Sequence, residues 1–296
     1  MKIRSGLVLL TVVFTAHAAE LKPETVKAWQ EYVHAATARM QERLNPDGHF
    51  LKIDENRDWG QRVRSGEILV LPDGAKSIKK VPSGLIHDWV GAVFVPHATL
   101  SDVLSVVRDY DRYKQIYRPS VIDSRARERR EHEDRFSMVL LNKSLFLKGA
   151  LDSDYQSSYI RVSDRRWYSV TETTRIQEID DYGEPAQHAL SEGEGSGLIW
   201  RLFSITRFDE RDDGVYIELE AIALSRDIPI SLRWIVEPIV RRVSIASMTT
   251  SLRQTEGAVR SGTALADAKT PVERYPTVTS DVLPSPRNSS AVHSLR

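Results

Sequence analysis

Apolar residues recur at steps of three and four along the first part of the chain. They are Val26, Trp29, Val33, Ala36, Met40 and Leu44. Such steps place side chains on one face of an α-helix, and the turn residues Asn45-Pro46-Asp47-Gly48 end the pattern. We therefore predict an amphipathic helix whose apolar stripe packs against a core, with binding to a membrane surface as the alternative.

The segment after this helix is polar and contains two short candidate strands. They are residues 50–53 and 67–71, and Pro72-Asp73-Gly74 closes the second with a turn. Residues 19–84 are too few and too polar to hold a core alone. We interpret them as an N-terminal extension of a main domain that begins near Gly84.

A strand-rich pattern begins at Ile86. The apolar run from there to Val95 is stopped by Pro96, which is typical of a buried strand. Two helical stretches follow, at 99–109 and at 110–117. The next candidate strands are 120–126, 134–141, 147–162, 166–178, 198–208 and 215–225. The acidic, glycine-rich stretch 180–197 predicts a loop over one end of the sheet.

The last two candidate strands predict a hairpin around the polar loop 209–214. If Phe208 pairs with Val215, side-chain alternation sorts the hairpin into two faces. The apolar face contains Val215, Ile217, Leu219, Ala221 and Ala223 with Trp200, Leu202, Ser204 and Thr206. The other contains Arg207, Tyr216, Glu218 and Glu220 and is interpreted as a solvent-exposed ladder. A slip of one residue would instead bury these charges, and the glutamates would have raised pKa values.

The longest helical pattern runs from Ile230 to about Arg253. Its expected buried stripe is Leu232, Ile235, Val236, Ile239, Val243, Ala246 and Thr250. Pro229 suits the first turn, and Pro238 is expected to kink the helix around a curved sheet. A sheet with one apolar face needs a cover, and this helix is the predicted cover. Residues 257–296, rich in Ser, Thr, Pro and Ala, predict a disordered tail.

This order of elements resembles the START-like superfamily, the helix-grip (SRPBCC) fold of polyketide cyclases and coenzyme-Q-binding proteins. The likeness runs from Gly84 to about Arg260, roughly 60% of the chain, and is carried by three segments. They are Gly84-Leu85-Ile86-His87-Asp88-Trp89-Val90-Gly91-Ala92, Asp109-Tyr110-Asp111-Arg112-Tyr113, and 215–229 leading into the last helix. It implies an α+β domain at 85–256, in which a curved antiparallel sheet of about seven strands grips the long helix.

The resemblance also implies a cavity between sheet and helix for an apolar molecule such as a lipid, quinone, sterol or polyketide. It includes no catalytic motif, so no catalytic residue is transferred from it. Inward positions supply the candidate ligand-binding residues, and small residues at Ala221 and Ala223 leave room beside them. The candidates are Trp89, Val93, Met138, Leu140, Trp200, Leu202, Leu219, Ala221, Leu232, Val236 and Ile239.

Three alternatives stay open beside a binding protein. The same residues could fill a dry core. An enzyme of the cyclase, hydratase or hydrolase type would use a polar group in the cavity, such as Ser204, Thr206 or His87. An interaction protein would dock a partner on residues 19–84 or on the tail, and a large exposed apolar patch would indicate it.

Composition excludes several classes of site and partner. Lys+Arg and Asp+Glu each total 41, so the chain lacks the cationic excess of a nucleic-acid binder. No cysteine is present, which excludes disulfides and thiolate ligands. The eight histidines show no metal-ligand spacing, and we expect no metal and no cofactor. The basic stretches 125–130 and 241–242 would allow a transient membrane contact, although ordinary surface is the preferred interpretation.

The first residues predict export. Lys2 and Arg4 precede an apolar run at 7–14, and Ala16-His17-Ala18 follows. This is the pattern of a secretory signal peptide, and the run is too short for a membrane anchor. We therefore expect residues 1–18 to be removed and the mature chain to be periplasmic or secreted. A buried N-terminal helix or a retained anchor is the alternative.

Overall fold

One antiparallel sheet organises the computed structural model, which describes residues 21–74, 78–144, 147–228 and 230–262. Within them the sheet has ten strands in the order β1-β3-β10-β9-β7-β6-β5-β4, with β2 on β3 and β8 on β7. Their bounds are β1 Leu69–Pro72, β2 Ile78–Val81, β3 Gly84–Pro96, β4 Val121–Arg129, β5 Glu133–Ser144, β6 Leu147–Arg161, β7 Arg166–Asp180, β8 His188–Ala189, β9 Arg201–Glu210 and β10 Gly214–Arg226.

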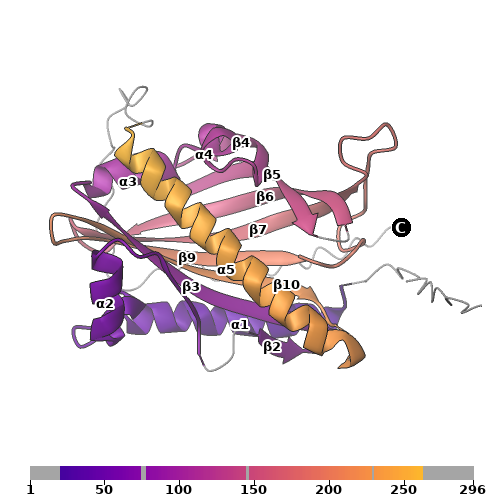
Figure 1. Cartoon of the computed structure of the whole chain (residues 1–296), viewed down its shortest axis with the longest axis horizontal. Coiled ribbons are helices and arrows are strands. Elements are labelled where there is room, and N and C mark those ends of the chain that lie inside the picture. The colour runs from indigo at the N-terminus through magenta and orange to yellow at the C-terminus, as the bar shows by residue number, and fades with distance from the viewer. Residues whose placement is uncertain (1–20, 75–77, 145–146, 229, 263–296) are drawn as a thin grey trace, which may run out of the picture.

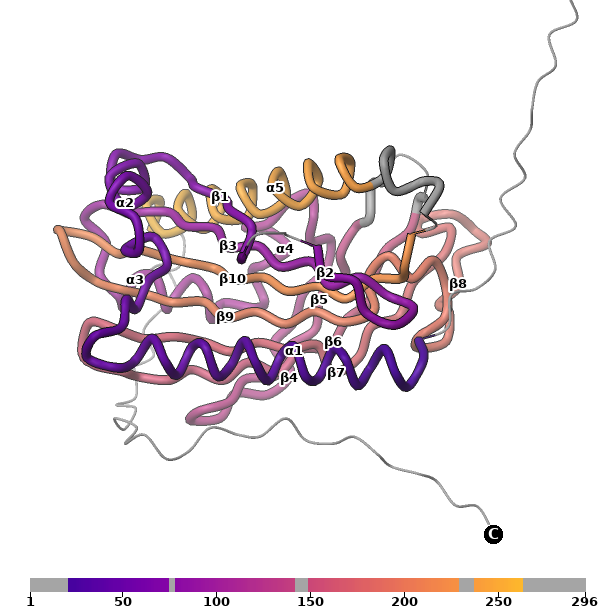
Figure 2. Tube along the Cα trace, turned by 90° about the horizontal axis from the view of Figure 1, so that it is seen from below, coloured from indigo at the N-terminus to yellow at the C-terminus, as the bar shows by residue number. Residues whose placement is uncertain are grey.

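Two long helices lie on opposite faces of this sheet (Figures 1 and 2). We call the face toward α5 the inner face and the face toward α1 the outer face. The helices are α1 Pro23–Glu42, η1 Lys52–Glu55, α2 Arg57–Arg64, α3 Leu100–Val107, η2 Tyr110–Arg112, α4 Tyr113–Ile116 and α5 Ile230–Arg260. The predicted helix-grip fold, a curved antiparallel sheet with a long C-terminal helix, is confirmed. The strands number more than about seven because β1, β2 and the short β8 join the sheet.

Most predicted elements appear at or near their predicted positions, with two corrections. Residues 50–53 do not form a strand, because Lys52 and Ile53 belong to η1 and donate their backbone N–H groups to the Glu218 carboxylate. The last helix continues to Arg260, so the predicted tail begins later than residue 257. The predicted signal peptide, 1–18, and the tail from 263 lie outside the described residues.

The amphipathic stripe of α1 packs against the sheet, as predicted. Trp29, Val33, Ala36 and Met40 are buried together with outer-face residues of β3, β9 and β10. Those sheet residues are Ile86, Ala92, Phe94, Phe203, Ile205, Tyr216, Ile222 and Leu224. The N-terminal extension therefore shares one core with the main sheet.

The C-terminal half of α5 approaches β3 closely at Gly91. A Cβ atom at this position would lie 2.5 Å from Met248 Sδ and 2.8 Å from Leu252 Cδ1. Both side chains are buried in one cluster with Val93 and Ile217. Glycine allows this close approach of helix and strand.

The predicted buried stripe of α5 is wrong over its described part. Ile239 is 37% exposed and Val243 is 58% exposed, whereas Met248 and Leu252 are buried. At 3.6 residues per turn, the two pairs lie about 180° apart around the helix. Apolar residues occur on both sides of α5, so periodicity alone did not select the side that packs on Gly91.

Candidate functional site

The β9–β10 hairpin forms the centre of the inner face. Ile217 lies opposite Phe208, and Leu219 lies opposite Thr206. The predicted Phe208–Val215 pair is thus displaced by two residues, which leaves the side chains within β9 and β10 on their predicted faces. The apolar side of the hairpin is the side that faces α5, where Ile217 packs with Met248 and Leu252.

The predicted ligand-binding residues divide into three groups. Seven lie on the inner face: Trp89, Val93, Met138, Leu140, Leu202, Leu219 and Ala221. Two are corrected. Trp200 is buried with α1 because it precedes β9 and packs into the outer core, and Ile239 lies on the helix side opposite Met248. Leu232 and Val236 lie outside the described side chains.

Part of the inner face is open although it belongs to central strands. Leu202, Leu219 and Ala221 are only partly buried, and so are Met138 and Leu140 on β5. By contrast, Trp89 and Val93, where α5 packs on β3, are buried. The helix therefore packs on the β3 side, and we call the five partly buried apolar residues on β10, β9 and β5 the partly accessible apolar strip.

A cluster of aromatic rings closes the β5–β6 end of this strip. Phe136 stacks on Tyr110, with ring centroids 4.1 Å apart, and on Tyr155, at 4.9 Å. Beside them Asp134 is fully buried and accepts hydrogen bonds from the Arg108 guanidinium and from Tyr110 OH. The pairing of this buried carboxylate makes the end of the sheet rigid.

His87 and Ser225 form a hydrogen-bonded pair on the inner face. His87 Nε2 lies 2.9 Å from Ser225 Oγ, and both residues are buried. Burial lowers the pKa of His87 to about 4, which makes it a weak general base near neutral pH. Within the described chain His87 Nδ1 has no partner, so no carboxylate orients the ring as in a catalytic triad.

The outer face differs most from what the sequence predicts. Glu218 and Glu220 are 0% and 3% exposed, and Arg207 between them is 1% exposed. The prediction of a solvent-exposed ladder is wrong, because α1 and η1 cover these strands. Arg207 donates to Glu218 at 3.2 Å and to Glu220 at 2.5 Å, and its Nε lies 3.1 Å from Met40 Sδ on α1.

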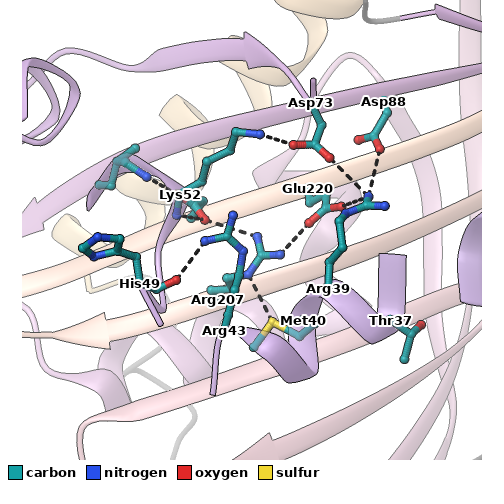
Figure 3. A network of polar contacts seen from close by, with 12 residues as sticks. Thr37, Arg39, Met40, Arg43, His49, Lys52, Asp73, Asp88, Arg207 and Glu220 are labelled. Carbon is teal, nitrogen blue, oxygen red and sulfur yellow. Dashed lines mark hydrogen bonds and ion pairs between the residues drawn. The ribbon is translucent and has the colours of Figure 1, made fainter. Parts of the chain in front are cut away.

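A second guanidinium joins three carboxylates at the same interface (Figure 3). Arg39 Nη2 lies 3.2 Å from Asp73, 3.2 Å from Glu220 and 3.5 Å from Asp88. Lys52 also pairs with Asp73. The three carboxylates lie close enough to share a cation, with ligand oxygens within 4.8 Å of one another. The Arg39 guanidinium lies among these three carboxylates and supplies the positive charge that a bound cation would otherwise supply.

We call these seven residues the charge cluster: Arg39, Lys52, Arg207, Asp73, Asp88, Glu218 and Glu220. Their electrostatics follow from burial and ion pairing. Burial raises the pKa of Asp88 to about 7, and Glu220 and Asp73 add to the shift. Burial also raises the pKa of Glu218, although Arg207 partly opposes it. For Asp73, burial is outweighed by Lys52, so its pKa is lowered. Counting Arg39, Lys52 and Arg207 against four carboxylates, the cluster has one carboxylate in excess.

A cavity of about 380 Å³ lies beside the charge cluster and not beneath α5. It is lined by Tyr32, Arg39, Arg43, Lys52, Asp73, Gly74, Arg207 and Glu220. The cations in its wall are engaged by carboxylates, as Arg43 is by Glu55 and Arg39 by Asp73. We therefore interpret the cluster as the polar attachment of α1 to the sheet.

Comparison with known proteins gave matches among solved structures only. No protein-family model and no curated protein matches the sequence. The STAR-related lipid transfer protein from Xanthomonas axonopodis is 18% identical, with a TM-score of 0.42 and coverage of 65% of this chain and 98% of that chain. Human STARD10 is 9% identical, with a TM-score of 0.39 and coverage of 79% and 94%.

A third similar structure is the Zhui aromatase/cyclase from Streptomyces sp. R1128. It is 15% identical, with a TM-score of 0.35, and the match covers 59% of this chain and 96% of that chain. At these identities and TM-scores, the similarities carry no argument about ligand or activity. Separately, none of the helices in the described part of the chain combines the length and hydropathy needed to span a membrane.

Proposed function

We propose that this protein is an exported binding protein for an apolar small molecule held between the inner face of the sheet and α5. The observation that carries the proposal is the accessible apolar strip of Leu202, Leu219, Ala221, Met138 and Leu140. Central strands beneath a long helix ordinarily bury their apolar side chains. Apolar side chains that stay partly exposed beside a packed core are typical of a ligand site.

An enzyme is the second candidate, and the His87–Ser225 pair is the observation that favours it. His87 is buried and neutral near pH 7, and Nδ1 has no acidic partner among the described residues. Ser204 and Thr206 are partly exposed on the inner face and have no neighbouring base across the hairpin, where they face Ala221 and Leu219. These features support binding over catalysis.

Filling the apolar strip should weaken ligand binding without unfolding the domain. Ala221 is partly buried on β10, between Trp89 and Ser204 on the neighbouring strands. We expect Ala221→Trp to weaken binding of the apolar dye N-phenyl-1-naphthylamine at least about tenfold, because the indole occupies the ligand volume. Fluorescence titration measures the affinity, and circular dichroism checks the fold.

The matched control is Ala189→Trp, which places the same side chain on exposed β8. It should bind the dye as the wild type does. If Ala221→Trp also binds the dye with wild-type affinity, the inner face is not the binding site and the proposal fails.

Export rests on the N-terminal residues, so it needs a test of its own. Expression of the full chain in a bacterium should yield a periplasmic protein that starts at Ala19 or Glu20, because Ala16-His17-Ala18 provides a cleavage site. Intact mass spectrometry of the periplasmic extract measures the start. An uncleaved chain recovered with the membrane fraction would indicate a retained anchor.

A further inference from the structure

Two buried hydroxyl groups on the inner face lack hydrogen-bond partners. Ser153 is 0% exposed and Tyr155 is 5% exposed. Across the described residues, neither Ser153 Oγ nor Tyr155 OH has a partner. Both lie on β6, two positions apart, so they point to the same face. Buried polar groups in native proteins are nearly always paired, and an unpaired group indicates a functional role or an unseen partner.

The aromatic cluster fixes these hydroxyls beside the accessible strip. The Tyr155 ring stacks on Phe136 with an angle of 6° between the ring planes. Ser153 lies opposite Met138, which is partly buried, and Tyr155 lies opposite Phe136. Tyr155 therefore has little rotational freedom, and Met138 and Leu202 of the apolar strip pack against the aromatic cluster that contains it.

We propose that Ser153 and Tyr155 are the polar anchor of the ligand, and that the ligand is an apolar molecule with one neutral oxygen group, a ketone or an alcohol. This inference rests on the proposed function and names the chemical class that the same site selects. The hydrocarbon part lies along Met138, Leu202 and Leu219, and the oxygen accepts a hydrogen bond from Tyr155 OH. Ser153 Oγ can donate to the same oxygen or accept from an alcohol.

The charges around the anchor select a neutral oxygen over a carboxylate. Burial raises the pKa of Tyr155, so the phenol remains a donor. Arg108, the arginine beside the aromatic cluster, is committed to Asp134. Arg175 pairs with Asp152 and Asp154, which alternate with Ser153 and Tyr155 along β6 and therefore lie on the outer face. A buried anionic head group would therefore have no free cation here among the described side chains, and burying an unpaired charge is unfavourable.

Tyr159 provides an internal comparison on the same strand and face. Its hydroxyl donates to the Val107 carbonyl at 3.1 Å and lies 3.2 Å from Tyr110 OH. Removing this partnered hydroxyl should lower the melting temperature. Removing the Tyr155 hydroxyl should leave the melting temperature unchanged or raise it, because no hydrogen bond is lost in the free protein.

The test measures displacement of bound N-phenyl-1-naphthylamine by three probes of equal chain length: decane, 2-decanone and decanoate at pH 8. In the wild type, 2-decanone should compete best. In Tyr155→Phe and in Ser153→Ala, the affinity for 2-decanone should fall about tenfold, as expected for one lost hydrogen bond, while that for decane is unchanged. Tyr159→Phe should keep the wild-type preference for 2-decanone.

Several results would overturn this inference. Decane and 2-decanone could compete equally well, with no effect of Tyr155→Phe. The protein would then bind apolar molecules, but Ser153 and Tyr155 would not be the anchor. Competition by decanoate as strong as that by 2-decanone would refute the neutral class. A melting temperature that falls in Tyr155→Phe as far as in Tyr159→Phe would mean that the hydroxyl is already satisfied in the free protein. If the dye does not bind at all, the proposed function fails together with the anchor.

Discussion

Arg207→Met is expected to destabilise the protein by about 3–5 kcal/mol at pH 7.5. The guanidinium is 1% exposed and pairs with two carboxylates that are themselves buried. Methionine preserves much of the volume but leaves Glu218 and Glu220 without their main counter-charge. The loss of an ion partner inside a protein leaves an uncompensated buried charge, which is costly. Urea denaturation at equilibrium measures the free energy of unfolding.

Two further variants separate lost charge compensation from lost packing. Adding Glu218→Gln and Glu220→Gln to Arg207→Met should recover more than half of the lost free energy, because neutral amides replace the buried charges. Arg62→Met removes a cation that pairs with Glu67 at the surface, where both side chains are more than 40% exposed, and should leave stability nearly unchanged because exposed ion pairs contribute little. If the triple variant is no more stable than Arg207→Met, packing against Met40 dominates and the electrostatic explanation is wrong.

The outer face shows why alternation alone could not predict burial. The period of two placed Arg207, Glu218 and Glu220 correctly on one face, opposite Ile217 and Leu219. It could not say whether a second layer covered that face. A signal was present in the same strands, because this face continues through Phe203, Ile205, Ile222 and Leu224. A face that is apolar at most of its positions needs a cover, and the stripe of α1 supplies it.

Inner-face predictions fared better for strands than for the helix. Side chains alternate between the two faces of a strand, so placing one residue fixes the face of all the others. The predicted pairing of β9 with β10 was wrong by two residues, and Leu219 and Ala221 therefore still lie on the predicted face. In α5, apolar residues on opposite sides offer two stripes, and the contact at Gly91 decides for Met248 and Leu252. That contact joins residues far apart in sequence, so the periodicity of the helix sequence could not predict it. The anchor at Ser153 and Tyr155 was missed because an unpaired hydroxyl can be recognised only in three dimensions.

Stability should also depend on the protonation of Asp88, which joins β3 to α1. Its side chain accepts a hydrogen bond from Tyr32 and contacts Arg39, both on α1, while Oδ1 has no partner in the described part of the chain. Burial raises its pKa from 3.8 to about 7, with Glu220 and Asp73 adding to the shift. Between about pH 4 and pH 7, Asp88 therefore keeps its proton in the folded protein, whereas in the unfolded chain it has released it. The resulting stabilisation is complete below about pH 4 and is lost as the pH rises through about 7.

Asp88→Asn should remove this dependence, because an amide does not titrate. We expect the free energy of unfolding of Asp88→Asn, minus that of the wild type, to increase by about 4 kcal/mol between pH 4 and pH 8. Urea denaturation across this range gives the difference, and amide hydrogen exchange should show α1 losing protection at high pH in the wild type only. Asp58→Asn, at the exposed start of α2, should give a nearly constant difference. A constant difference for Asp88→Asn as well would mean that Tyr32 and Arg39 compensate the ionised carboxylate fully, and that the attachment of α1 is insensitive to pH.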